Sequence, residues 1–390
     1  MAPICCPPPP RHTEPAGSHQ GPRTPGEKPI PTSRTAVLLL NFGEPGTPDP
    51  DAVTEFLERI FLANARLEPD ADPADARERS RELARRRTPG LLEAYERIGG
   101  SPLDRQALAQ GAALERALSA RGHPAHVAVG MQFTEPSIEA ALAALREEGA
   151  AIVVALPVYP LCGPSTSVAA LDGVDQALGR LGWRPDIRRI TGWHRHPGYV
   201  RLRGKAIHDA AAAAGWGLND PGVRLVFSAH GTPLRYIEEG SRYVEYVEDW
   251  CETMARALGV SEWTLGYQNH ANRAIAWTQP GIEAALGDLP GVSKVLVDAI
   301  SFMHEQSETL MELDVELAEE AAGFGLEFRR VGIPHDDEAF AEVLADLTLA
   351  ALGDDIATLP PLTACRCRPG ADLCFNGAPV DSPPRAGSTT

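Results

Sequence analysis

Apolar runs of strand length alternate with helical segments along most of this 390-residue chain, and this alternation restricts the fold more than any other feature. The clearest apolar runs lie at residues 35–41, 151–158, 223–227 and 293–299. After each run, apolar residues recur at helical spacing. Because a β-α-β order joins parallel strands through right-handed crossovers, the sequence predicts parallel sheets covered by helices.

The number of predicted strands, about eight, decides between one wide sheet and two narrow ones. A chain of this length favours two lobes. We therefore predict an α/β fold with two Rossmann-like lobes, each a four-stranded parallel sheet flanked by helices, and a cleft between them. The predicted segments are a disordered Pro-rich extension (1–33), a first lobe (34–170), a second lobe (171–335), a C-terminal helix that packs back on the first lobe (336–352) and a Cys-containing tail (353–390).

Composition narrows the classes of function. A formal net charge of −17 without a basic stripe argues against nucleic acid as a partner. No apolar run approaches the roughly 20 residues that span a bilayer. Prolines occupy residues 7–10, where a signal peptide would need an apolar core, so we expect a cytoplasmic protein. Peripheral membrane contact and the choice between monomer and homodimer stay open.

His230 follows the apolar run at 223–227, within the segment SAHGTP. Ligands of open α/β sheets bind beyond the carboxyl ends of the strands, and His230 is predicted at that edge. Gly231 and Pro233 turn the backbone away from the strand there. The functional interpretation is a proton acceptor or metal ligand, since neutral imidazole serves as either. The alternative is a histidine that only caps the strand with a backbone hydrogen bond.

A row of carboxylates forms the second candidate feature. Glu308, Glu312 and Glu316 recur every four residues in a long helix predicted at 305–322, which places them along one face. This helix begins directly after the strand predicted at 293–299. Clustered carboxylates have raised pKa values and suit cation delivery or proton removal. The alternative is a solvated acidic face.

These two segments resemble the ferrochelatases, enzymes that insert Fe²⁺ into a porphyrin. FSAHGTP at 227–233 resembles the S-x-H-x-x-P signature of the family, and FMHEQSETLMELDVE at 302–316 resembles its segment F-x-x-D-H-x-E-T-L-x-E-x-D-x-E. Further similarity extends over roughly residues 35–350 and includes LLLNFGEPGTP, IGGSPL, GMQFTEPSIEAAL and LPVYPLCGPSTS.

The resemblance implies an enzyme of haem biosynthesis that acts on protoporphyrin IX or coproporphyrin III. It implies His230 and Glu308 as the central pair: His230 takes pyrrole protons or is the last metal ligand, and Glu308 orients or deprotonates it. Glu312 and Glu316 would continue a polar path for Fe²⁺ or outgoing protons. The implied substrate-binding residues are Met131, Gln132, Phe133, Ser165, Thr166, Tyr243, Gln268 and Trp277.

Two other functions compete with this interpretation. One is another class II chelatase, which acts on a sirohydrochlorin-type tetrapyrrole. The other is a catalytically impaired porphyrin- or haem-binding protein. The second alternative is motivated by departures from the family pattern: Gln306 stands where a site histidine is expected, with His304 two residues earlier, and Gln132 stands where an arginine or lysine is usual.

The tail carries three cysteines in the pattern Cys365-x-Cys367-x6-Cys374. A [2Fe–2S] cluster needs four ligands. Some ferrochelatases hold such a cluster through C-terminal cysteines and one distant cysteine, and by this resemblance Cys162 is the candidate fourth ligand, with Cys251 as second choice. The same ligands would suit a tetrahedral zinc site. Free thiols in a disordered tail are the alternative.

Overall fold

A computed structural model describes residues 35–67, 75–269 and 275–354 of the chain. From the tail it describes residues 356, 359, 362–365, 367–368 and 372–376. The extension predicted at 1–33 lies outside the described residues.

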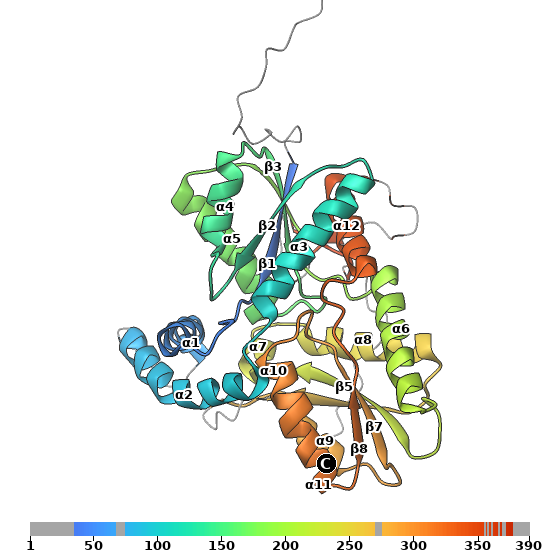
Figure 1. Cartoon of the computed structure of the whole chain (residues 1–390). Helices are drawn as coiled ribbons and strands as arrows, with labels where there is room; N and C mark the ends of the chain where they lie inside the picture. Colours follow the sequence, from blue (N-terminus) through green and yellow to red (C-terminus); the bar gives the residue numbers. More distant parts are fainter. Residues whose placement is uncertain are drawn as a thin grey trace, which may run out of the picture.

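Two four-stranded parallel sheets form the centres of two lobes, as predicted (Figure 1). The two sheets have corresponding strand orders, β2-β1-β3-β4 and β6-β5-β7-β8. The strands of the first are β1 (Thr35–Asn41), β2 (His126–Met131), β3 (Ile152–Pro157) and β4 (Asp186–Arg189). The strands of the second are β5 (Val223–His230), β6 (Trp263–Gln268), β7 (Lys294–Ala299) and β8 (Glu327–Arg330).

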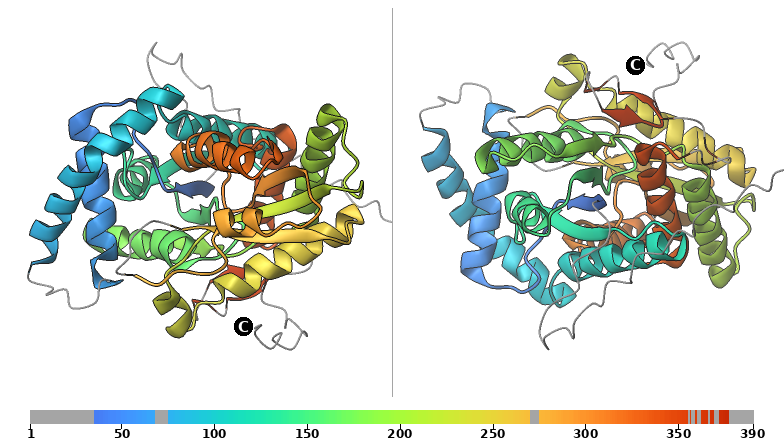
Figure 2. Two further views of the ribbon diagram at one scale, coloured as in Figure 1. Left: turned by 90° about the horizontal axis from the view of Figure 1, so that it is seen from below. Right: turned by 90° about the horizontal axis from the view of Figure 1, so that it is seen from above.

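Helices cover both faces of the sheets (Figure 2). In the first lobe these are α1 (Pro50–Asn64), η1 (Ala65–Leu67), α2 (Ala76–Ile98), α3 (Leu103–Ala120), α4 (Ile138–Glu147), η2 (Pro164–Val168) and α5 (Ala169–Leu181). The remaining helices are α6 (Pro197–Ala214), α7 (Leu234–Glu238), α8 (Tyr243–Leu258), α9 (Ile282–Gly287), α10 (Ser307–Leu310), η3 (Glu312–Leu317), α11 (Ala318–Gly323) and α12 (Glu338–Leu352). None of the helices within the described residues is long and apolar enough to cross a membrane.

The central strand β1 explains why the first lobe is layered. Its side chains alternate between the two faces of the sheet. Leu38 and Leu40 pack into the apolar cluster that α4 and α5 complete, whereas Val37 and Leu39 pack into the cluster that includes α3 and α12. Because both faces are buried, the sequence of the strand is continuously apolar rather than alternating.

The lobe boundary differs from the one predicted at residue 170. β4 pairs with β3 in the first sheet, and α5 is the crossover that joins them. A boundary at 170 would cut this β-α-β unit, so the first lobe extends through Arg189. The helix predicted at 336–352 does return to the first lobe: α12 packs against α3, β3 and β4, and also against α6.

The long helix predicted at 305–322 is interrupted. α10 has four residues, the π-helical segment η3 follows it, and α11 ends the run. The Glu316 N–H donates to the Met311 carbonyl five residues earlier (2.9 Å), which is the π-helical pattern. Acidic residues at a spacing of four do not distinguish this geometry from a regular α-helix.

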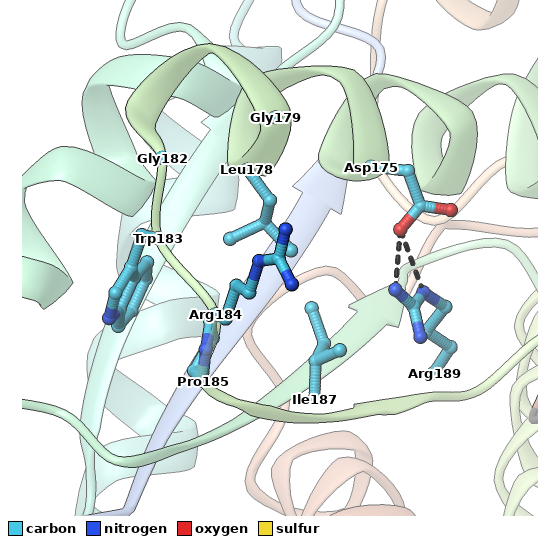
Figure 3. Close-up of a pocket in the computed structure, with 9 residues that line it drawn as sticks. All are labelled: Asp175, Leu178, Gly179, Gly182, Trp183, Arg184, Pro185, Ile187 and Arg189. Atoms are coloured by element: carbon cyan, nitrogen blue, oxygen red, sulfur yellow. Dashed lines mark hydrogen bonds and ion pairs between the residues drawn. The ribbon is translucent and has the colours of Figure 1, made fainter.

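The tail forms a two-stranded antiparallel ribbon, β9 (Thr363–Ala364) and β10 (Leu373–Cys374), that the sequence did not predict. Leu373 bridges to Ile190, directly after β4. Between the ribbon strands, Arg368 pairs with Asp172 and Asp175 of α5. The Asp175 carboxylate also accepts a hydrogen bond from Arg189. These two residues line the edge of a pocket of about 340 Å³ between α5 and β4 (Figure 3). Charged pairs therefore hold the tail against the first lobe.

Candidate active site

His230 is the last residue of β5, at the edge where ligands of such sheets bind, as predicted. Its backbone is held by two hydrogen bonds to side chains of neighbouring elements. The His230 N–H donates to Ser301 Oγ after β7 (2.9 Å), and the Tyr243 hydroxyl of α8 donates to the His230 carbonyl (3.0 Å). Ser301 and Tyr243 also hydrogen-bond each other (2.9 Å). The strand end is therefore fixed on two sides.

The imidazole of His230 faces Glu308, the other catalytic candidate, which lies in α10. Nε2 lies 3.1 Å from Glu308 Oε1, and Nδ1 lies 2.6 Å from the Gly231 carbonyl. A carbonyl only accepts hydrogen bonds, so Nδ1 carries a proton and Nε2 is the nitrogen that exchanges one. The sequence placed these two residues at neighbouring strand ends, and the structure brings their side chains into contact.

Electrostatics favours the protonated form of His230. Burial lowers the pKa of His230, but the Glu308 carboxylate, with help from Glu312, raises it to about 9. Burial, reinforced by the charge of Glu308, raises the pKa of Glu312 to about 8. Glu316 raises the pKa of Glu312 slightly further. Glu308 and Glu312 are thus interacting, partly buried carboxyl groups, whereas Glu316 at the end of the row is exposed.

Two amide side chains hold the carboxylates. Gln268 Nε2 donates to the Glu308 carbonyl (3.0 Å) and to Glu312 Oε2 (3.2 Å). Gln306 Nε2 donates to Glu308 Oε2 (2.6 Å). Gln306 therefore occupies the place of the expected second histidine with a donor that does not titrate. His304 does not replace that histidine, because it is buried elsewhere and its pKa is lowered by burial to about 3.

The predicted substrate-binding residues fall into two groups around the strand ends. Gln132, after β2, accepts a hydrogen bond from the Tyr159 hydroxyl (3.1 Å) and donates to the Ser165 carbonyl (3.4 Å), and Thr166 lies in the same π-helical turn. Trp277 bridges to Pro233, just past His230.

Two of the predicted residues are packed inside the first lobe. Met131 is buried in the core, and the Phe133 ring lies 4.6 Å from that of Phe42 and 6.5 Å from that of Phe56. Their contact with substrate stays a prediction.

Two residues of the site were missed by sequence reasoning. Ser301 follows β7 and holds His230. Glu44 follows β1 and contacts Ser307, the first residue of α10. Both lie in loops after parallel strands, and that position is the signal that could have indicated them.

The tail cysteines converge with one distant cysteine. Hydrogen bonds donated by Cys162, Cys367 and Cys374 lower the pKa of the Cys365 thiol far below its usual range. The hydrogen bond that the Cys162 thiol donates to Cys365 is the largest cause of the raised pKa of Cys162. Cys251 lies buried in α8, and no other cysteine contributes to its pKa shift. Within the described part of the chain, no group of three or more His, Cys, Asp or Glu side chains is arranged to hold a metal ion.

Known proteins are similar to this chain over most of its length. The sequence model of the family Ferrochelatase matches residues 34–352. A ferrochelatase of Citrifermentans bemidjiense is 31% identical over 331 residues, which cover 82% of this chain and 99% of the relative. A ferrochelatase of Nostoc punctiforme is 34% identical over 335 residues, which cover 82% of each protein. Among solved structures, SirB from Bacillus subtilis with Fe³⁺ has a TM-score of 0.47 at 14% identity, covering 82% of this chain and 98% of that one.

Proposed function

The chain belongs to the ferrochelatase family and inserts Fe²⁺ into a porphyrin in haem biosynthesis, and from this premise we propose that His230 and Glu308 are its catalytic pair. The observation that supports the pair is the 3.1 Å contact between Nε2 of His230, at the end of β5, and Oε1 of Glu308, in the helix α10 that follows the neighbouring strand β7. Because the relatives at 31% and 34% identity are ferrochelatases, we set aside a sirohydrochlorin-type chelatase and an impaired binding protein.

Porphyrin metallation releases two pyrrole protons as the divalent ion enters the ring. Nε2 of His230 accepts a pyrrole proton, and the Nδ1–H bond to the Gly231 carbonyl keeps the ring in the orientation that this transfer needs. Glu308 stabilises the imidazolium that forms.

The raised pKa of His230 imposes an order on these events. At neutral pH the histidine already holds a proton, so this proton must leave before a pyrrole proton is accepted. The approach of a divalent cation to the carboxylates repels it and restores neutral imidazole. Glu312, whose pKa is about 8, also holds a proton at neutral pH, so it releases its own proton toward Glu316 before it accepts the one from His230.

The test is anaerobic Fe²⁺ insertion with both protoporphyrin IX and coproporphyrin III, the two substrates that the sequence leaves open. His230→Ala should abolish insertion while porphyrin still binds, as followed by fluorescence. Glu308→Gln should lower turnover by roughly 10² to 10⁴, and Glu312→Gln should have a weaker effect, mainly on the apparent Fe²⁺ affinity. Turnover of His230→Ala within about tenfold of wild type would exclude the pair.

We also propose that Cys162, Cys365, Cys367 and Cys374 hold a [2Fe–2S] cluster. Although the described side chains are not arranged as ligands of a single metal ion, Cys365 is in hydrogen-bond contact with the other three thiols, and Cys162 also contacts Cys367. These four residues supply the number of thiolates that such a cluster takes. The sulfurs also have donors around them: Thr191 Oγ1 donates to Cys365 Sγ (3.2 Å), and the Asn376 N–H donates to Cys374 Sγ (3.2 Å). When bound, a cluster supplies one-electron redox chemistry and cross-links the tail to the first lobe.

Anaerobically purified protein should be reddish-brown, with roughly two non-haem irons and two sulfides per chain. Cys365→Ser should bleach it, whereas Cys251→Ser is the matched control and should keep the colour. One zinc and no sulfide would replace the cluster with a tetrahedral site. Freely titrating thiols without metal would exclude both.

Location and assembly stay proposals of the same kind. We expect a cytoplasmic protein, either monomer or homodimer, with porphyrin and Fe²⁺ as its small-molecule partners. Cell fractionation and sedimentation of the purified protein test these expectations, and co-sedimentation with vesicles tests peripheral membrane contact.

A further inference from the structure

We propose that Glu44 is a positioning residue for Glu308, acting from the first lobe on the element of the second lobe that presents the catalytic carboxylate. The role of Glu44 rests on the proposed role of Glu308. Glu44 lies in the loop after β1 and is 5% exposed.

Both carboxylate oxygens of Glu44 accept hydrogen bonds from one residue of the second lobe, Ser307. The Ser307 N–H donates to Oε2 (3.0 Å), and the Ser307 hydroxyl donates to Oε1. Ser307 opens α10 and directly precedes Glu308. Rotation or shift of Ser307 would therefore move the carboxylate that faces Nε2 of His230.

α10 needs an outside partner at this end. It has only four residues and runs into the π-helical segment η3, so it has few hydrogen bonds of its own. The first N–H groups of a helix have no partner inside it. Gln306 caps the N–H of Thr309, and Glu44 receives the N–H of Ser307.

Glu44 itself is held firmly by the first lobe. Its N–H donates to Asp104 Oδ1 (3.2 Å), and Asp104 accepts from the Thr134 hydroxyl (3.4 Å). A hydrogen bond from the Ser101 side chain reaches the Glu44 carboxylate, and the hydroxyl of the fully buried Tyr95 lies close to it. The support is thus built from β1, α2 and α3, which is what precise positioning requires.

The contact between Glu44 and Ser307 depends on the hydrogen-bonding capacity of the Glu44 side chain and not on its charge. The partners described for its carboxylate are neutral, and the charge of Glu308 acts against it, so no attractive ion pair explains its burial. Two acceptor oxygens directed at one N–H and one hydroxyl do explain it. An amide could keep both contacts, because its oxygen accepts from the Ser307 N–H and its NH₂ donates to the hydroxyl.

The experiment compares three variants in anaerobic steady-state Fe²⁺ insertion. Glu44→Ala should lower kcat by about 10- to 100-fold, the size expected for misplacing a catalytic group, with KM and Kd for porphyrin within about twofold of wild type. Glu44→Gln should restore kcat to within about threefold, since it keeps the hydrogen bonds. Ser307→Ala loses the hydroxyl contact but keeps the N–H, so its kcat should fall between those of the other two. The control is Gln110→Ala, which removes an equally buried hydrogen bond, from α3 to the His335 carbonyl (2.8 Å), away from α10.

The background of Glu308→Gln separates positioning from general support of the fold. If Glu44 acts through Glu308, Glu44→Ala should have no further effect on kcat in that background. An equal loss in both backgrounds, a parallel loss of porphyrin affinity, or a Glu44→Ala kcat within about twofold of wild type would overturn the proposal. Full turnover by Glu308→Gln alone would instead refute the catalytic pair, so the two failures are distinguishable.

Discussion

The replacement Glu308→Gln should change how the stability of the protein depends on pH. Glu308 is the main cause of the raised pKa of His230, which is about 9 against an ordinary 6.5. A raised pKa means that the folded state binds this proton more tightly than the unfolded chain does. The resulting stabilisation is complete below pH 6.5 and disappears as the pH rises through 9.

The size of the effect follows from the same values. A pKa of about 9 in place of the ordinary 6.5 corresponds to about 3 kcal/mol of stabilisation of the protonated folded state. Water reaches 30% of the His230 side chain and 20% of that of Glu308, so screening reduces the expected contribution to about 1–2 kcal/mol. Glu312 acts in the same direction, because its raised pKa makes folding less favourable as the pH rises from 4.5 to 8. Glu308 raises both pKa values, so its loss flattens both contributions.

The assay is guanidinium unfolding at pH 6.5 and pH 9, combined with an NMR titration of the His230 ring. Wild-type stability should fall by about 1–3 kcal/mol between the two pH values, and Glu308→Gln should lose less than half of that slope. The matched control is Glu319→Gln, which removes a carboxylate that is 67% exposed and paired with Arg97 on the surface. Equal slopes for wild type and Glu308→Gln, or an unchanged titration of His230, would refute the electrostatic account of the pair.

Three further outcomes are expected. Arg203→Ala should destabilise the protein by about 3–5 kcal/mol in denaturant unfolding, since it leaves the fully buried Asp298 without its partner, and a loss below about 1 kcal/mol would contradict this. Gly266→Ala should lower the Tm, because the new Cβ would lie 2.7 Å from the backbone of α9, and an unchanged Tm would show that the helix can move away. Tyr243→Phe should reduce kcat by roughly three- to tenfold through loss of the hydrogen bond to the His230 carbonyl, with an unchanged circular dichroism spectrum, and full activity would show that Ser301 suffices.

The parts of the structure that the sequence predicted are those with local signals. Buried parallel strands are continuously apolar, and their ends place His230 and the segment that carries Glu308 at one edge. The break between α10 and η3 has no such signal, because carboxylates spaced by four suit an α-helix and a π-helix alike.

Contacts between segments that are far apart in the chain could not be predicted from local sequence patterns. Glu44 and Ser307 are 263 positions apart, so neither residue alone indicates the other. The convergence of Cys162 with the tail depends on a two-residue ribbon strand bridged to Ile190, which is too short to recognise as a strand. The lobe boundary predicted at residue 170 differs from the observed one because the sequence of α5 contains no signal that assigns this helix to one sheet.

The return of α12 to the first lobe has a consequence for synthesis of the chain on the ribosome. Phe340 and Leu344 of this helix share an apolar cluster with Val37 and Leu39 of β1. A nascent chain that has reached residue 190 therefore contains all four strands of the first sheet but lacks the helix that covers part of one face. Such an uncovered apolar face favours aggregation until residues 338–352 emerge. Ribosome-stalled chains that end before residue 338 should therefore bind holding chaperones, whereas chains that expose α12 should be released from them.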